Sequence, residues 1–149
     1  MSSLWTENIE MPEFPTLEKD IRTQVLIIGG GMAGVLCAYF LQQAGVVYCL
    51  LEKDRICQGV TGHTTAKITA QHGLIYEKSL QSMGQERAEL FLKANLRAVE
   101  NYKNLGRFLD CDMEETDSYL YSVRERRKLE SEIQALGSLG FQADYTEDT

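Results

Sequence analysis

An apolar run that stops at a glycine-rich turn is the feature that most constrains how this chain can fold. The run predicts a strand over 24–28 and is followed by three glycines with the spacing G-x-G-x-x-G, namely Gly29, Gly31 and Gly34. Apolar residues at helical spacing then predict a helix over 32–44, and a second apolar strand over 47–51 ends at Glu52. A strand, a glycine turn, a helix and a strand closed by an acidic residue are together typical of a dinucleotide-binding βαβ unit.

Each glycine has a separate physical role in such a unit. Gly29 permits a sharp turn off the strand, Gly31 leaves room for a pyrophosphate to approach the backbone, and Gly34 lets the helix pack tightly on the strand. The helix begins with Met32 and Ala33. The free N–H groups of its first turn, at the positive end of the helix dipole, are predicted to receive the pyrophosphate.

The acidic residue at the end of the second strand predicts which nucleotide binds. Glu52 is suited to accept hydrogen bonds from ribose hydroxyls, and its charge would repel a 2′-phosphate, which argues against NADP. Lys53 follows directly and is included in the predicted site. The second strand is apolar throughout, as in a parallel sheet that is covered on both faces.

Composition excludes several other classes of protein. With 44% hydrophobic and 25% charged residues, the chain is globular in composition and neither disordered nor fibrous. The formal net charge of -7 argues against nucleic acid or an anionic membrane as a main partner. No apolar run is long enough to span a bilayer, and the N-terminus lacks the features of a secretory signal, so a cytoplasmic location is expected.

The four cysteines show no metal-ligand spacing, so no metal site is expected. Cys37 falls in the predicted helix and Cys49 in the second strand, where small apolar side chains pack well. Reduced thiols in a core are the expected state of these residues.

The chain is predicted to contain four consecutive parts. These are an extended N-terminal arm (1–22), a nucleotide-binding segment (23–75), a long helix (76–110) and the strand–helix–strand start of a second domain (111–149). Pro12 and Pro15 exclude a helix in the arm, and Trp5, Phe14 and Leu17 are expected to hold it against the body.

Local patterns place the elements within these parts. Gly45 stands where a helix C-cap glycine belongs. The amphipathic pattern predicts a helix over 85–109, with Phe91, Tyr102 and Phe108 in the core. Further elements are a strand over 118–123, a helix around 129–136 with the solvated charge cluster 124–128 at its first turn, and the start of a strand over 141–145.

The predicted fold is an α/β, Rossmann-like βαβ unit followed by the start of an α+β substrate domain. Only one half of a doubly wound sheet is present, and no residues close a substrate pocket. We therefore expect the chain to be the N-terminal part of a larger protein, incomplete as a fragment and inactive by itself.

The glycine turn and the segment after Glu52 together resemble a known family. Residues 24–52, followed by 60–69 (Val-Thr-Gly-His-Thr-Thr-Ala-Lys-Ile-Thr), resemble the FAD-dependent oxidoreductases of the glycine oxidase and D-amino-acid oxidase (DAO) superfamily. The likeness covers nearly the whole chain. Trp5, the lead-in 12–15 and the segment 61–67 look more narrowly like a bacterial branch whose full-length members carry a C-terminal Rieske iron–sulfur domain.

This resemblance implies a cofactor and a reaction. FAD would lie across the sheet, and the family oxidises amines and amino acids by hydride transfer from a C–N carbon to the flavin. The catalytic residues, and the residues that select the substrate and the electron acceptor, would lie in later parts of a longer chain. This chain ends before any Rieske ligands. The implied FAD-binding residues are Gly29, Gly31, Met32, Ala33, Gly34, Glu52, Lys53, Thr61, Gly62, Thr64, Thr65 and Lys67.

Several side chains in and near this segment have two interpretations. Thr64 and Thr65 either bind phosphate or cap a following helix, and Lys67 either lies near the flavin or is solvated. His63 makes a polar contact or, less in keeping with its position, a covalent flavin link, whereas His72 is better explained as structural than as catalytic.

A second function from another class also fits the glycine motif. The chain could be a non-catalytic NAD-binding Rossmann module that senses redox state or supports a partner. The segment 61–67 favours FAD, because simple NAD modules continue from the acidic residue to a short loop and a helix.

Overall fold

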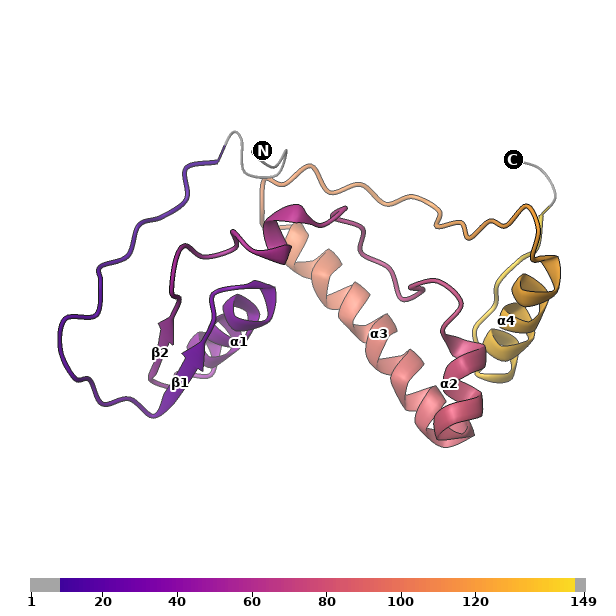
Figure 1. Ribbon diagram of the computed structural model, residues 1–149, viewed down its shortest axis with the longest axis horizontal. Coiled ribbons are helices and arrows are strands. Elements are labelled where there is room, and N and C mark those ends of the chain that lie inside the picture. Colours follow the sequence, from indigo (N-terminus) through magenta and orange to yellow (C-terminus); the bar gives the residue numbers. More distant parts are fainter. Residues whose placement is uncertain (1–8, 147–149) are drawn as a thin grey trace. The chain divides into compact units, whose positions relative to one another are not determined.

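The computed structural model describes residues 9–146, and these divide into two compact units, one ending at Lys67 and the other beginning at Ile68 (Figure 1). The elements in chain order are β1 (Val25–Ile28), α1 (Met32–Gln43), β2 (Tyr48–Leu51), the 3-10 helix η2 (Val60–His63), α2 (Tyr76–Met83), α3 (Gln85–Gly106) and α4 (Arg126–Ser138).

The first unit contains a two-stranded parallel sheet. β1 pairs with β2 in a register that sets Val25 opposite Tyr48 and Ile28 opposite Leu51. Parallel strands need a crossover connection, and α1 provides it beside the sheet (Figure 1). The predicted α/β class and the strand–helix–strand order are thus confirmed for this part of the chain.

The end of α1 is fixed by the glycine that the sequence predicts. Gly45 has φ +67°, a conformation that L side chains rarely adopt. Its N–H donates to the Gln42 carbonyl at 3.1 Å, and the Val46 N–H donates to the Leu41 carbonyl at 2.9 Å. This pair of bonds is a Schellman motif, which satisfies the last carbonyls of the helix and directs the chain into β2.

The second unit is held by a small apolar core between three helices. α2 packs on both α3 and α4, and Gly84, at φ +78°, separates α2 from α3. The buried core residues are Tyr76, Ala88, Leu92, Ala135, Leu136 and Leu139. The Tyr76 hydroxyl donates to the Ala70 carbonyl at 2.6 Å, and burial, with the nearby charge of Glu132, raises the pKa of this phenol.

A buried carboxylate links two of these helices. Glu132 lies in α4, is 1% exposed, and accepts the N–H groups of Tyr76 and Glu77, each at 2.9 Å. These are first-turn N–H groups of α2, which have no partner within their own helix. The side-chain amide of Gln71 donates to the same carboxylate at 3.4 Å. Glu132 therefore caps α2 from a neighbouring helix and ties α4 to it.

Two predicted strands are absent. Residues 118–123 and 141–145 form neither helix nor strand, and Tyr121 and Val123 are 82% and 91% exposed. A strand needs a neighbouring strand to satisfy its backbone groups, and within the described residues neither segment has one. The helices predicted over 85–109 and around 129–136 are present as α3 and α4, and α2 precedes them as a separate helix.

The expected packing of the N-terminal arm is wrong for the residues that can be tested. Residues 9–22 form no helix or strand, and the side chains of Phe14 and Leu17 are 68% and 49% exposed. Trp5 lies outside the described residues. Glu13 approaches Arg55 at 3.9 Å, but both side chains are largely exposed, so the pair contributes little.

Other side chains that were expected to be covered are also exposed. All four cysteines are free thiols, but Cys37 is exposed and Cys49 only partly buried. Phe108 is 86% exposed, and Phe91 is 38% exposed although its ring lies 6.0 Å from that of Tyr76. In β1, Ile28 is 83% exposed, because the described residues provide no cover for that face of the sheet.

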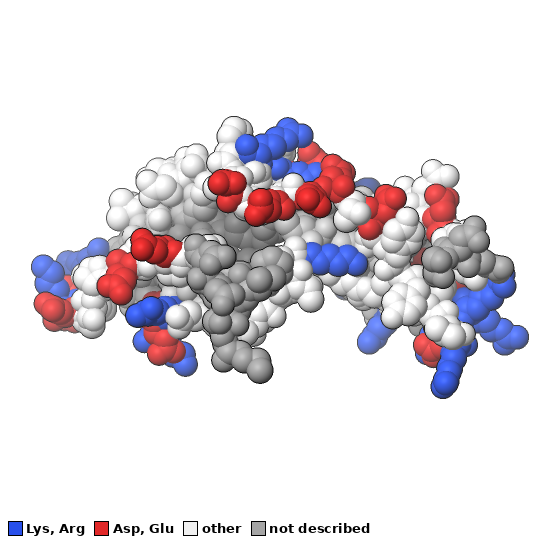
Figure 2. Space-filling model, turned by 90° about the horizontal axis from the view of Figure 1, so that it is seen from above, with Lys and Arg blue, Asp and Glu red and all other residues white. Residues whose placement is uncertain are grey.

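Acidic side chains gather in a row on the face shown in Figure 2, in keeping with the net charge of -7. Among the described residues, no helix combines the length and the apolar character that a membrane crossing requires.

Candidate functional site

The turn between β1 and α1 requires glycine at two of its positions. Gly29 has φ +105°, and its N–H donates to the Leu51 carbonyl at 2.7 Å, which joins the turn to the end of β2. A Cβ atom at Gly34 would lie 1.9 Å from the Gly29 carbonyl oxygen. Gly29 therefore makes the sharp turn and Gly34 the close packing of helix on strand, as their spacing predicts.

The third glycine faces open space rather than packed atoms. A Cβ at Gly31 would have one neighbour within 4 Å, the Thr61 hydroxyl oxygen at 3.4 Å. Gly31 is also the N-cap of α1 and has no side chain with which to cap it. Within residues 9–146, the amide groups of Gly31, Ala33 and Gly34 have no hydrogen-bond partner. Uncommitted N–H groups at the positive end of a helix are suited to bind an anion.

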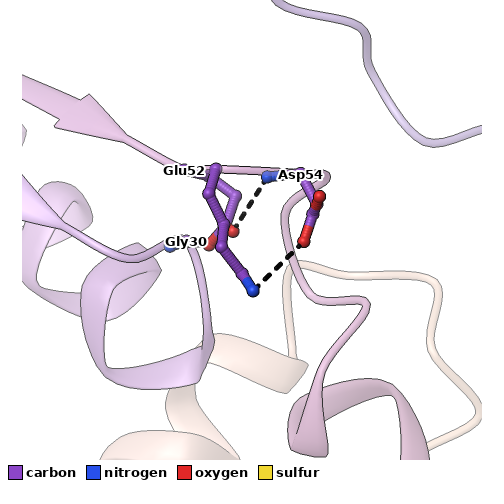
Figure 3. A network of polar contacts seen from close by, with 4 residues as sticks. Gly30, Glu52 and Asp54 are labelled. Atoms are coloured by element: carbon purple, nitrogen blue, oxygen red, sulfur yellow. Dashed lines mark hydrogen bonds and ion pairs between the residues drawn. The ribbon is translucent and has the colours of Figure 1, made fainter.

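The acidic residue after β2 lies against this turn. One carboxylate oxygen of Glu52 accepts the Gly30 N–H at 2.7 Å, and the other accepts the Asp54 N–H at 3.2 Å (Figure 3). These two hydrogen bonds hold the pKa of Glu52 below its ordinary value, and the bond from the Gly30 N–H has the larger effect. The carboxylate is therefore ionised at neutral pH, and its remaining lone pairs can accept further hydrogen bonds from ligand hydroxyls.

An open cleft of about 850 Å³ borders the glycine turn. Such a volume lies in the range of small-molecule and cofactor sites. Four of the residues predicted from the sequence meet there: Gly31, Glu52, Lys53 and Thr61. The other lining residues are Asp54, Arg55, Cys57, Gln58, Gly59 and Val60.

The first two residues of the short helix η2, Val60 and Thr61, line the cleft together with Gly31. The Thr61 hydroxyl oxygen accepts the Met32 N–H at 2.9 Å, and Gly62, which is buried, donates its N–H to the Gly59 carbonyl at 3.2 Å. Cys57 is a cleft residue that sequence reasoning missed: its N–H donates to the Gly30 carbonyl at 2.8 Å, and its φ is +59°. No local pattern marks this cysteine, because its place depends on a contact between distant segments.

The remaining predicted residues are not brought into this cleft. Thr64, Thr65 and Lys67 do not line it. The interpretation that these threonines cap a following helix is wrong, because no helix begins between η2 and α2. Instead the Thr64 hydroxyl oxygen accepts the Ala66 N–H at 3.1 Å in a local turn.

Neither histidine lines the cleft. The His63 ring nitrogen Nδ1 lies 2.9 Å from the Gly59 carbonyl oxygen, an ordinary polar contact, and His72 is exposed. In the described part of the chain, no group of three His, Cys, Asp or Glu residues has the arrangement needed to hold a metal ion.

Comparison with known families settles the classification. A model of the family "FAD dependent oxidoreductase" (DAO) matches residues 24–147, which is most of the chain. The chain belongs to this family. The resemblance inferred from the glycine turn and the segment 60–69 is thereby confirmed, and FAD is the cofactor that this family uses.

Two curated proteins extend the comparison. The chain is 36% identical over 148 residues to a Bacillus subtilis (strain 168) protein named "Putative Rieske 2Fe-2S iron-sulfur protein YhfW", a match that covers 97% of this chain and 29% of that protein. It is 42% identical over 67 residues to the mitochondrial dimethylglycine dehydrogenase of Rattus norvegicus, covering 44% of this chain and 8% of the enzyme. The chain thus spans less than a third of either relative. No solved structure matches it.

Proposed function

We propose that this chain is the N-terminal FAD-binding part of a flavin-dependent oxidoreductase that oxidises the C–N bond of an amine or amino acid. The observation that carries the proposal is that Gly31, whose N–H is uncommitted at the start of α1, and Glu52 line one cleft, in a chain of the FAD dependent oxidoreductase family. The small share of each relative that the chain spans supports a longer full-length protein.

The glycine turn fits the diphosphate of FAD. A side chain at Gly31 would project toward the cleft, whereas glycine leaves the backbone open, and the amides of Gly31, Ala33 and Gly34 are available as donors. We assign these groups, with Met32 and Gly29 as their scaffold, to the diphosphate. The positive end of the α1 dipole favours the anion at the same place.

The acidic residue fits the adenosine ribose. Glu52 is held by two backbone N–H groups and keeps lone pairs for the ribose hydroxyls. Lys53 lines the same cleft and is assigned to the adenosine side. Thr61 of η2 lines the facing wall, and Gly62 is the buried residue that follows it. Thr64, Thr65 and Lys67 are assigned to the part of FAD that extends beyond the cleft.

The substrate class is proposed from the family and from one relative. When bound, FAD supplies the redox chemistry by taking two electrons and a proton from a carbon next to nitrogen. The rat relative is named for dimethylglycine, an N-methylated amino acid, which supports an amine or amino acid here. This chain binds and orients the cofactor, and we expect the catalytic groups to come from other parts of the full-length protein.

Further properties of the full-length protein are proposed on narrower grounds. A Rieske [2Fe–2S] cluster is proposed from the name of the Bacillus relative, and no residue of this chain is assigned to it. A cytoplasmic location stays a prediction from the sequence. The alternative function, a non-catalytic NAD-binding module, has no specific observation in its favour.

A cofactor titration of the purified chain and of the full-length protein tests the proposal. We expect FAD to bind and NADH not to compete with it, and we expect Gly31→Val to abolish FAD retention by filling the cleft beside the amides. Gly137→Val is the matched control, because a Cβ at Gly137 would meet no atom within 4 Å and this residue lies in α4. Equal FAD content in the Gly31→Val protein, or tighter binding of NADH than of FAD, would refute the assignment.

A further inference from the structure

The helix that faces the cleft is capped from a distance. α1 begins after a glycine, so no local side chain can accept its first N–H groups. The Thr61 hydroxyl oxygen accepts the Met32 N–H at 2.9 Å, across 29 residues of sequence. One of the unsatisfied donors of the helix is thus paired with a side chain of η2, and its neighbours are left uncommitted.

The same bond holds the wall of the cleft. Residues 57–61 are joined to the glycine turn at both ends: the Cys57 N–H donates to the Gly30 carbonyl at 2.8 Å, and Thr61 accepts from Met32. These two attachment points flank Gly31 on either side. The separation between the wall and the backbone of Gly31 therefore depends on both bonds.

We propose that Thr61 is a positioning residue for FAD, a role that rests on the proposed function. By accepting the Met32 N–H, its hydroxyl holds η2 beside Gly31, and it leaves the amides of Gly31, Ala33 and Gly34 for the ligand. Thr61 acts through the first turn of α1, whether or not FAD is present. A residue that only touches the cofactor would have no effect on the first turn of α1 in the FAD-free protein.

Two measurements on the same variants test this role: the FAD dissociation constant, and amide hydrogen exchange at Met32 in the FAD-free protein. Thr61→Val removes the hydroxyl at nearly constant volume. We expect it to raise the dissociation constant about fivefold to tenfold, the equivalent of one neutral hydrogen bond, and to speed exchange at Met32. Thr61→Ser restores the acceptor and is expected to return both values to within about twofold of the parent, as for one preserved bond.

The control is Thr69→Val, the same chemical change at a hydroxyl that accepts the Gln71 N–H in a local turn and does not line the cleft. We expect it to change neither value. Exchange across β1 and β2 in the same spectra shows that the unit is folded, and Thr61→Ala replaces the valine variant should the methyl group that takes the place of the hydroxyl unfold it.

Each contrary outcome has a separate meaning. Weaker FAD binding with unchanged Met32 exchange would mean that Thr61 acts only by touching the cofactor, which overturns the positioning role. Faster exchange with an unchanged FAD dissociation constant would reduce Thr61 to a structural cap, which also overturns it. A parent protein that binds no FAD overturns the proposed function and this role together, whereas the first two outcomes leave the proposed function standing.

Discussion

Alanine at two glycines of the same turn is expected to have opposite effects on folding and on cofactor binding. In Gly34→Ala the new Cβ would lie 1.9 Å from the Gly29 carbonyl oxygen and 3.1 Å from its carbon, whereas real Cβ contacts are essentially never under 3.0 Å. The helix and the turn must therefore separate by about 1 Å, because both atoms belong to rigid backbone. Overpacking of this kind costs about 1–3 kcal/mol or more of folding free energy.

In Gly31→Ala the new Cβ would meet only the Thr61 hydroxyl oxygen, at 3.4 Å, an ordinary contact distance. Gly31 has φ -79°, which alanine adopts without strain. Alanine is a poorer N-cap than glycine by about 0.5–1 kcal/mol, and the lower entropy of its unfolded chain offsets about 0.4–1 kcal/mol of this cost. The fold should therefore tolerate Gly31→Ala, and the methyl group should instead occupy space that the diphosphate requires.

Thermal unfolding of the FAD-free variants, followed by FAD titration, separates the two effects. Gly34→Ala should lower the unfolding midpoint by several degrees, and Gly31→Ala should leave it nearly unchanged while weakening FAD binding at least about tenfold. A Gly34→Ala protein as stable as the parent would contradict the close packing of α1 on the turn. A Gly31→Ala protein that binds FAD with the affinity of the parent would contradict the proposed place of the diphosphate.

Two further predictions concern the buried and the cleft carboxylates. Glu132→Gln should destabilise the protein by about 1–3 kcal/mol and speed exchange at Tyr76 and Glu77, because the two N–H groups bind different oxygens and the NH2 that replaces one of them cannot accept. Glu130→Gln, at an exposed ion pair in the same helix, should cost about 0.5 kcal/mol or less, and equal losses would contradict the capping role. Backbone N–H donors lower the pKa of Glu52, so the stability that its charge contributes is present above about pH 4.5 and is lost as the pH falls further. The unfolding midpoints of the parent and of Glu52→Gln should therefore converge in acid. A difference between them that stays constant with pH would show that the charge does not matter.

The first unit could largely be predicted from the sequence because its signals are local. The strand predicted over 24–28 is Val25–Ile28, and the helix predicted over 32–44 is Met32–Gln43. Glycines indicate turns because they adopt positive φ values, such as the +105° of Gly29 and the +67° of Gly45, far more readily than other residues do. The same local order of strand, glycine turn, helix and acidic residue indicated a dinucleotide site, and the segment 60–69 after it indicated the family.

The predictions that were wrong concern elements whose structure or burial depends on a second segment packed beside them. The alternating pattern of 118–123 describes a surface that suits a strand, but a strand forms only beside another, and the described residues provide none there. Phe108 lies on an apolar helical stripe, yet a stripe is buried only where another element covers it. Patterns of this kind indicate which side chains favour burial, but they do not indicate whether another strand or helix covers them.

The sequence by itself determined the strand–glycine–helix–strand order, the acidic residue that ends it and the membership of an FAD-dependent family. Only the tertiary structure decided that Thr61 pairs with Met32, that Cys57 joins the glycine turn, and that Glu132 enters the core to cap a helix 56 residues away in sequence. The physical reason is that periodicity and glycine conformations are properties of neighbouring residues. A hydrogen bond between distant segments forms only when the packing of the whole unit brings donor and acceptor together.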